Sequence, residues 1–367
     1  MRAYLPMLVL GLLPALPGAA VSGVVAGIDP QSDVDDGPPV QEAAAAYGPA
    51  AGASNTELNN SWGVTRIFAD QAHARGINGA GITVAILDTG IDYTHPELAA
   101  SYIGGYDFVF NDNDPFDDNF LSHGTHMAGI IAAKENGVGM VGVAPGAKIL
   151  AVKVLDGAGF GMAEWTISGI QWAVAHGANI INMSLTGQDS PELKDACDAA
   201  RRAGVLLVAA AGNGYPGGDP VEVDYPAAYD SVIAVTATDS ANRHADFAAY
   251  GPKLELAAPG ADIYSTVRGG YDTISGTSEA AAFVTGAAAL YLQSNTQDLN
   301  NDSLVDSEDV RLLMQRTAGD LGTPGRDASF GYGLLNAGAV PEPSTAWLLI
   351  AAGTSLSGWI VARRRKR

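Results

Sequence analysis

The sequence predicts an α/β protein with three layers, in which helices cover both faces of a doubly wound, mostly parallel sheet. Two observations support this fold class. Short, continuous runs of apolar and β-branched residues alternate with longer segments of helical period. Strands that are apolar on both sides must be buried on both faces, so helices have to cover the sheet above and below.

The order of the elements follows from these runs. We expect strands at residues 83–87, 148–154, 180–183, 205–209 and 232–236. We expect helices at residues 122–133, 162–176, 191–203 and 278–293. In doubly wound sheets, functional residues gather at the carboxyl ends of the strands. Asp88, Ser184 and Asn213 each follow a predicted strand, so this edge of the sheet is the expected site.

The composition indicates a packed protein that does not bind nucleic acid. Hydrophobic residues make up 47% of the chain and charged residues 16%. The 40 acidic residues outnumber the 20 basic ones, and the net charge of −20 repels nucleic acid and anionic lipid. Cys197 is the only cysteine, so no intrachain disulfide forms, and we expect it to be buried in the helix at 191–203. We expect a monomer.

The N-terminal end has the pattern of an export signal. Residues 1–20 carry Arg2, an apolar run, and small residues near Ala20, as a secretory signal peptide does. Residues 21–55 are rich in Gly, Pro, Ala and Asp without a clear period, which is typical of a low-complexity spacer.

The C-terminal segment 339–367 has three parts. Val340-Pro341-Glu342-Pro343-Ser344 precedes an apolar stretch at 346–362, which is just long enough for a transmembrane helix, and a basic end that should stay cytoplasmic. These parts together resemble the PEP-CTERM sorting signal of Gram-negative bacteria. The resemblance implies transient anchoring in the inner membrane, processing by an exosortase-type enzyme, and delivery to the outer surface or the extracellular space. A plain membrane anchor is the alternative.

Three motifs between these ends carry an acid, an imidazole and a hydroxyl. They are Asp88-Thr89-Gly90, His123-Gly124-Thr125-His126 and Gly276-Thr277-Ser278. A serine hydroxyl is a weak nucleophile until an imidazole takes its proton, and the imidazole needs a buried carboxylate to fix its tautomer. Ser278, His123 and Asp88 can supply these groups. The motifs resemble those of the subtilisin family (the subtilases), and the resemblance extends from about Trp62 to Ala337.

This resemblance implies a subtilisin-like domain at 56–338 that hydrolyses peptide bonds in protein or peptide substrates through an acyl-enzyme. The segment ending at Asn213 resembles the oxyanion-hole segment of the family, with the backbone N–H of Ser278 as a second donor. His123 and His126 could instead bind a metal, but no nearby acid or cysteine completes a zinc motif.

Two residues depart from the family motif. Glu279 and Ala282 stand where the family usually has Met and Pro. Alanine suits a helix interior, whereas a carboxylate facing the oxyanion would oppose catalysis, so we expect Glu279 to point away. These departures motivate one alternative, a catalytically inactive surface or matrix-binding protein of the same fold. Another acyl hydrolase, such as an esterase, is the second alternative.

Two segments resemble the strands that pair with an extended substrate through the main chain. They are Ser184, Leu185, Thr186 and Gly187, and the opposite stretch 157–161 that begins at Gly157. Thr186 replaces a glycine beside the P1 side chain, the residue before the cleaved bond, and should narrow its pocket. Asp224 lies near the expected pocket floor, and we hypothesise that it favours Lys or Arg at P1. Surface exposure of Asp224 is the alternative.

Two Ca²⁺ sites are expected, with structural roles. Glu97 and Asn136 align with the strong calcium site of the family, which the backbone carbonyls of the loop 134–140 would complete. The insertion 298–309 resembles an EF-hand or dockerin-type loop. Its oxygen-bearing residues are Asp298, Asn300, Asp302, Asp306 and Asp309. A solvated acidic turn in which Asp306 caps a helix is the alternative.

Overall fold

The computed structural model describes residues 7–9, 55–215, 221–294 and 297–342. Its central sheet has seven strands: β2 (Thr83–Asp88), β3 (Tyr102–Asp107), β4 (Lys148–Lys153), β6 (Ile180–Met183), β7 (Leu206–Ala210), β8 (Ile233–Thr238) and β9 (Leu256–Pro259). They lie in the order β3-β4-β2-β6-β7-β8-β9, and every neighbouring pair is parallel. The predicted fold class is confirmed.

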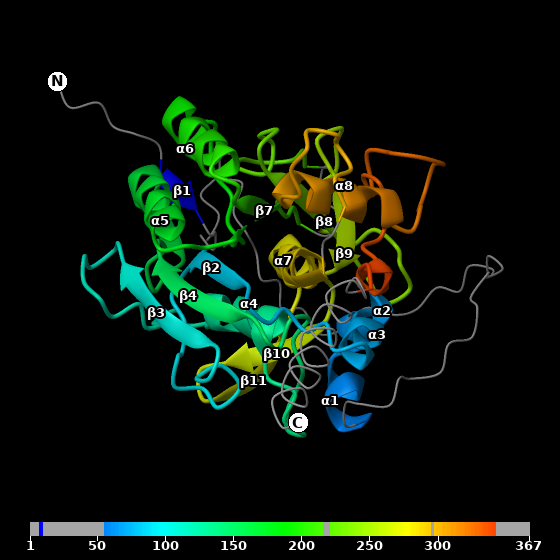
Figure 1. Ribbon diagram of the computed structural model, residues 1–367. Coiled ribbons are helices and arrows are strands. Elements are labelled where there is room, and N and C mark those ends of the chain that lie inside the picture. Colours follow the sequence, from blue (N-terminus) through cyan, green and yellow to red (C-terminus); the bar gives the residue numbers. More distant parts are fainter. Residues whose placement is uncertain (1–6, 10–54, 216–220, 295–296, 343–367) are drawn as a thin grey trace, which may run out of the picture.

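Helices flank the sheet on both faces, as Figure 1 shows. They are α1 (Asn55–Asn60), α2 (Trp62–Arg66), α3 (Ala69–Ala74), α4 (His123–Ala132), α5 (Ala163–Ala175), α6 (Pro191–Arg202), α7 (Thr277–Ser294), α8 (Ser307–Thr317) and the 3₁₀ helix η1 (Ala337–Ala339). Two small antiparallel sheets complete the fold. One pairs β10 (Ile263–Val267) with β11 (Gly270–Ile274), and the other pairs β1 (Met7–Val9) with β5 (Phe160–Met162).

Strand residues alternate between two hydrophobic cores on opposite faces of the sheet. In β2, Val84 and Ile86 belong to the core that contains residues of α4 and α7. Ala85 and Leu87 belong to the core that contains residues of α5 and α6. Because side chains point alternately to the two faces and both faces are covered, the strand has no position for a solvated residue.

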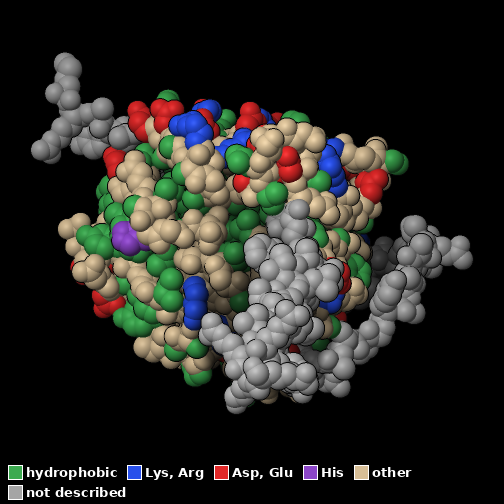
Figure 2. Space-filling model, viewed as in Figure 1, with side chains coloured by type: hydrophobic (Ala, Val, Ile, Leu, Met, Phe, Trp, Pro, Cys, Tyr) green, Lys and Arg blue, Asp and Glu red, His purple; other side chains and the backbone are tan. Residues whose placement is uncertain are grey.

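The helix ends have identifiable caps. α6 begins where Ser190 accepts a hydrogen bond from the backbone N–H of Leu193, with Pro191 in the first turn. Cys197 is buried in this helix, as predicted, and burial raises the pKa of its thiol to about 12, so it stays protonated. Charged side chains of both signs lie over α6 in Figure 2. Lys194 and Asp198 of this helix form an ion pair.

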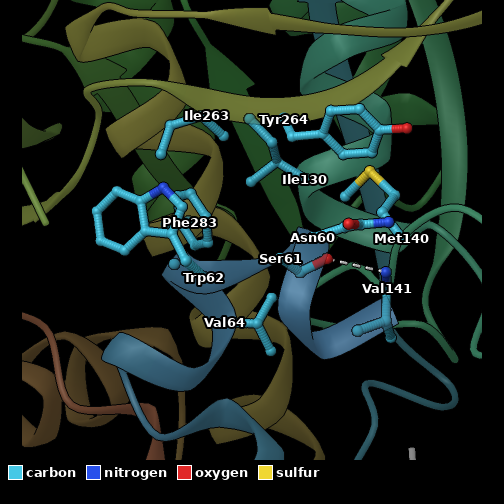
Figure 3. Close-up of a pocket in the computed structure, with 11 residues that line it drawn as sticks. Asn60, Ser61, Trp62, Val64, Ile130, Met140, Val141, Ile263, Tyr264 and Phe283 are labelled. Carbon is cyan, nitrogen blue, oxygen red and sulfur yellow. Dashed lines mark hydrogen bonds between the residues drawn. The ribbon is translucent and has the colours of Figure 1, made fainter. Parts of the chain in front are cut away.

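The N-terminal helices close one end of the core that contains α4 and α7. A small apolar cavity there is lined by Trp62, Ile130, Ile263 and Phe283, among others, and Figure 3 shows the backbone N–H of Val141 bonded to the hydroxyl of Ser61 beside it. No residue of the Asp, His and Ser motifs lines this cavity, so we assign it no role in chemistry.

Several predicted terminal features lie outside the described residues. These are the signal peptide apart from residues 7–9, the spacer up to residue 54, and the span at 346–362. Within the described ranges, no helix has the length and apolar character needed to cross a bilayer.

Candidate active site

Asp88 and His123 form a buried hydrogen-bonded pair at the carboxyl edge of the sheet. Asp88 ends β2, His123 begins α4, and Oδ1 of Asp88 lies 2.7 Å from Nδ1 of His123. A carboxylate can only accept, so Nδ1 carries the hydrogen and Nε2 remains as the acceptor. Burial by itself lowers the pKa of His123, but the charge of Asp88 and this hydrogen bond outweigh burial and raise it.

Asp117, which the sequence reasoning missed, joins the Asp and His motifs. Its carboxylate accepts from the hydroxyl of Thr89 at 2.9 Å and from the hydroxyl of Thr125 at 2.6 Å. Asp117 is fully buried, and burial raises its pKa. In the sequence, the one hint of this link is that Thr89 follows Asp88 and Thr125 lies two residues after His123.

Lys153 binds the segment that follows Asp88. Its buried ammonium donates to the carbonyl oxygens of Thr89 at 2.6 Å and Leu155 at 2.8 Å, and to the carboxylate of Asp118 at 2.7 Å. All three hydrogens are therefore used. This holds the chain that follows Asp88 in one position.

Ser278 lies in the first turn of α7, which packs beside α4 (Figure 1). Its hydroxyl donates to the carbonyl of Ser184 at 3.3 Å, and the hydroxyl of Ser184 donates to the carbonyl of Ser278 at 2.9 Å. This rotamer leaves Ser278 without a hydrogen bond to His123 within the described part of the chain. Rotation about its Cα–Cβ bond is needed to release the hydroxyl from Ser184.

Asn213 presents a buried donor without a partner. Its Oδ1 accepts from the backbone N–H of Thr277 at 2.9 Å and from the hydroxyl of Thr277 at 3.0 Å. These bonds fix the amide, so Nδ2 points the other way, where no described residue accepts from it. A preorganised, unpaired donor is what a developing oxyanion requires.

The prediction that Glu279 points away from the site is wrong. Helix α7 is buried on nearly all sides, so position 279 faces the interior. Oε1 of Glu279 lies 3.4 Å from Nδ1 of His126. Nε2 of His126 lies 3.1 Å from the carbonyl of Ile263.

The residues predicted to pair with substrate and Asp224 lie in neighbouring segments. Ser184, Leu185, Thr186 and Gly187 continue from β6, and the backbone N–H of Gly187 donates to the carbonyl of Tyr225 at 2.7 Å. Oδ2 of Asp224 lies 3.1 Å from the point where a Cβ on Gly212 would stand, one residue before Asn213. Within the described residues, its carboxylate makes no hydrogen bond or ion pair, and burial raises its pKa to about 6. Gly157, opposite, accepts from Asn119.

The first predicted calcium residues lie together. Oε2 of Glu97 accepts from Nδ2 of Asn136 at 2.9 Å, and Oε1 accepts from the hydroxyl of Tyr271 at 2.8 Å. Glu57, which sequence reasoning missed, is also buried here and accepts from the backbone N–H groups of Asn136 and Gly137. Two buried glutamates beside a loop rich in carbonyls are oxygen donors of the kind that Ca²⁺ prefers.

In the second predicted calcium loop, carboxylates accept hydrogen bonds from the loop's own backbone. Asp298 accepts from the N–H groups of Asn301 and Ser303. Asp306 and Asp309 form a capping box at the start of α8, which agrees with the helix-cap alternative. Among the described residues, no group of three or more His, Cys, Asp or Glu side chains lies close enough to hold a metal ion.

Comparison with known proteins identifies the class. The subtilase family matches residues 79–333, so the chain belongs to this family, whose members are serine endopeptidases. The PEP-CTERM protein-sorting motif matches residues 339–366. Both predicted resemblances are thereby confirmed, and so is the predicted enzyme class.

The curated relatives are similar over most of their length. Subtilisin of Bacillus pumilus is 42% identical over 283 residues, which cover 77% of this chain and 98% of that protein. Subtilisin NAT of Bacillus subtilis subsp. natto is 42% identical, with 77% and 71% covered. The thermostable alkaline protease of Halalkalibacterium halodurans is 43% identical, with 77% and 73% covered.

Proposed function

We propose that this chain is an exported endopeptidase in which Asp88, His123 and Ser278 form the catalytic triad. His123 takes the proton of Ser278 through Nε2 while the serine oxygen attacks the peptide carbonyl. The imidazolium is stabilised by Asp88. It then gives its proton to the leaving amine, and a water activated in the same way hydrolyses the acyl-enzyme.

The observation that carries this proposal is the buried Asp88–His123 hydrogen bond at 2.7 Å together with the unpaired donor of Asn213. The first fixes the tautomer that leaves Nε2 free, and the second offers a hydrogen bond that only an oxyanion from substrate would use. Release of Ser278 from the carbonyl of Ser184 is the one side-chain rotation that the mechanism adds.

A fluorophosphonate probe tests the proposal, because it reacts covalently only with an activated serine. We expect stoichiometric labelling of the folded protein and none in Ser278→Ala. Ser275→Ala, which removes a hydroxyl three residues earlier, should label like the natural chain. Correctly folded protein that does not react with the probe would instead favour the inactive binding protein, and labelling without casein cleavage would favour another acyl hydrolase.

Substrate binding should use main-chain pairing on two sides. Residues 184–187 and β5 offer extended backbone, and β5 pairs antiparallel with residues 7–9 of the chain itself. An edge that accepts one extended segment can accept another of any sequence. Side-chain selection then falls to Asp224, which we propose favours Lys or Arg at P1, with Thr186 narrowing the space beside it.

The sorting motif supports export, and we propose the finer route from the two ends of the chain. Residues 1–20 would direct secretion as a signal peptide, and residues 346–362 would hold the protein in the inner membrane until an exosortase-type enzyme removes them. The released enzyme would act at the outer surface or outside the cell.

We propose that Ca²⁺ is held by Glu97, Asn136 and Glu57 with carbonyls of the loop 134–140, and separately by the loop 298–309. Calcium at about 100 times its Kd should stabilise the fold by about 2.7 kcal/mol, which raises Tm by about 5–10 °C in a domain of this size. Scanning calorimetry with Ca²⁺ and with chelator measures this. Glu97→Gln should lose the part due to the first site, and Asp302→Ala the part due to the second. A Tm that chelation leaves unchanged would remove both sites.

A further inference from the structure

A buried acid and a buried imidazole lie close together, and the acid directly follows Ser278 in the chain. Oε1 of Glu279 and Nδ1 of His126 are 3.4 Å apart, and neither atom has a hydrogen-bond partner among the described residues. Glu279 is 1% exposed and His126 is fully buried. A proton held between them would satisfy both of these buried polar atoms.

The partner of Nε2 decides which tautomer His126 adopts. The carbonyl of Ile263 can only accept, so Nε2 carries a hydrogen. In a neutral His126, Nδ1 is then an acceptor. An ionised Glu279 would place a second acceptor and an uncompensated charge against it, whereas a protonated Glu279 would donate to it. Burial raises the pKa of Glu279 and lowers the pKa of His126, so the shared proton resides on the acid.

The other oxygen of Glu279 and the amide of Asn213 both lie near Gly276. Oε2 is 2.7 Å from the point where a Cβ on Gly276 would stand, and Nδ2 of Asn213 is 3.3 Å from the same point. The missing side chain of Gly276 makes room for both groups. An ionised Glu279 would therefore place a negative charge in the same region as the oxyanion and would repel it.

We propose that Glu279 is a positioning residue that acts as a neutral acid: it donates its proton to His126 Nδ1, leaves the Asn213 donor unopposed, and suppresses catalysis when it ionises. This rests on the proposed function. His123 in α4 and Asp88 at the end of β2 act on Glu279 through space, and Asp117 in the loop before α4 acts on His123. The backbone of Ile263 and Asp272 faces His126 from β10 and β11.

The charge of Glu279 also acts on the base. A carboxylate at position 279 would raise the pKa of His123, since the two groups interact through space. While Glu279 is neutral, this contribution is absent and the pKa of His123 is lower. The neutral, basic form of His123 is then present at lower pH. Catalysis would then need neutral Glu279 and neutral His123 together. Burial raises the pKa of Glu279 to about 7, and Asp88 raises the pKa of His123 to about 9, so this form is a minority between those pH values. The rate should still fall at low pH, where His123 is protonated, and at high pH, where Glu279 is ionised.

Kinetics of Glu279→Gln test this inference. In the natural chain, kcat/KM for a peptide substrate should fall about tenfold for each pH unit on the alkaline limb, because the fraction of neutral Glu279 falls by that factor. Glutamine can still donate to Nδ1 of His126 but cannot ionise, so the variant should keep its activity to high pH. Glu164→Gln, a change at an exposed position of α5, should keep the alkaline limb. An alkaline limb that is identical in the natural chain and Glu279→Gln would overturn the inference.

A spectroscopic measurement keeps the inference testable if that variant does not fold. The natural protein should show the infrared C=O band of a protonated, buried carboxyl at pH values below about 7, and the band should disappear as the pH rises through that value. His126→Gln should shift that range. Absence of the band on the acidic side would contradict the neutral acid. A natural chain without activity or fluorophosphonate labelling would contradict the triad instead, so the two failures are distinguishable.

Discussion

Replacement of Asp88 by alanine is expected to lower kcat about 10⁴-fold, the size known for the aspartate of such triads, subtilisin included. Without the carboxylate, Nδ1 of His123 loses its 2.7 Å partner. The imidazole is then free to adopt either tautomer, and the positive charge it acquires is no longer stabilised. Steady-state cleavage of a peptide ester and a peptide amide measures the loss.

The pH dependence of the same variant has a definite sign. His123 must be neutral to act as a base, so the rate rises as pH increases through its pKa. Asp88 raises that pKa by its charge and hydrogen bond. Its removal should therefore move the acidic limb of the profile to lower pH, even as the maximum rate collapses.

Asp92→Ala is the matched control for this experiment. Asp92 is also buried just after β2, but its carboxylate accepts from Thr94 and does not contact His123. The Asp92→Ala change should lower stability more than kcat.

A double variant of Asp88 and Ser278 should lose little more kcat than Ser278→Ala alone, because the effects of groups that act as a unit are not additive. An Asp88→Ala enzyme with nearly full kcat would remove Asp88 from the triad.

Replacement of Asp224 by asparagine is expected to lower the preference for Lys and Arg over Leu or Phe at P1 by about 10- to 100-fold. The carboxylate has no partner within the described chain and is partly desolvated beside Gly212. A pair of unit charges at 4 Å is worth about 4 kcal/mol at an effective dielectric constant of 20, and solvent near the site reduces that. A P1 peptide library gives the ratio of kcat/KM values.

The pH dependence of this preference identifies the residue. Burial raises the pKa of Asp224 to about 6, so the preference for basic P1 residues should fade as pH drops through that value. Asp224→Asn should show no such change. Glu222→Gln removes the same charge from an exposed side chain two residues earlier and should leave the preference intact. An unchanged preference in Asp224→Asn would show that Asp224 is only a surface acid.

Most of the sheet could be predicted from the sequence because its strands are buried on both faces. All five predicted strands and four predicted helices occur, with bounds shifted by no more than two residues. The two edge strands, β3 and β9, were not predicted. β3 carries Gly104 and Gly105 in place of an apolar run, and β9 is only four residues long and ends at Pro259. The hairpin β10–β11 was not predicted either, because exposed residues in β11 interrupt the apolar pattern.

The site could be predicted where a residue belongs to a short sequence motif. Asp88, His123 and Asn213 lie where their motifs indicated. The positions of Glu279, Asp117 and Glu57 were not, since each is set by contacts between segments far apart in the chain. Position 279 illustrates the limit: the sequence reveals a carboxyl in the first turn of a helix, but only the packing of α7 against α4 turns it inward to His126.

The burial of α7 has a consequence for how the protein loses activity. This helix begins at Thr277, one residue before Ser278, and runs through the interior, where nearly all of its residues are shielded from solvent. Elements of this kind open only when the whole domain opens. Heat therefore has no route to displace Ser278 while the sheet remains intact, and inactivation and unfolding must proceed together.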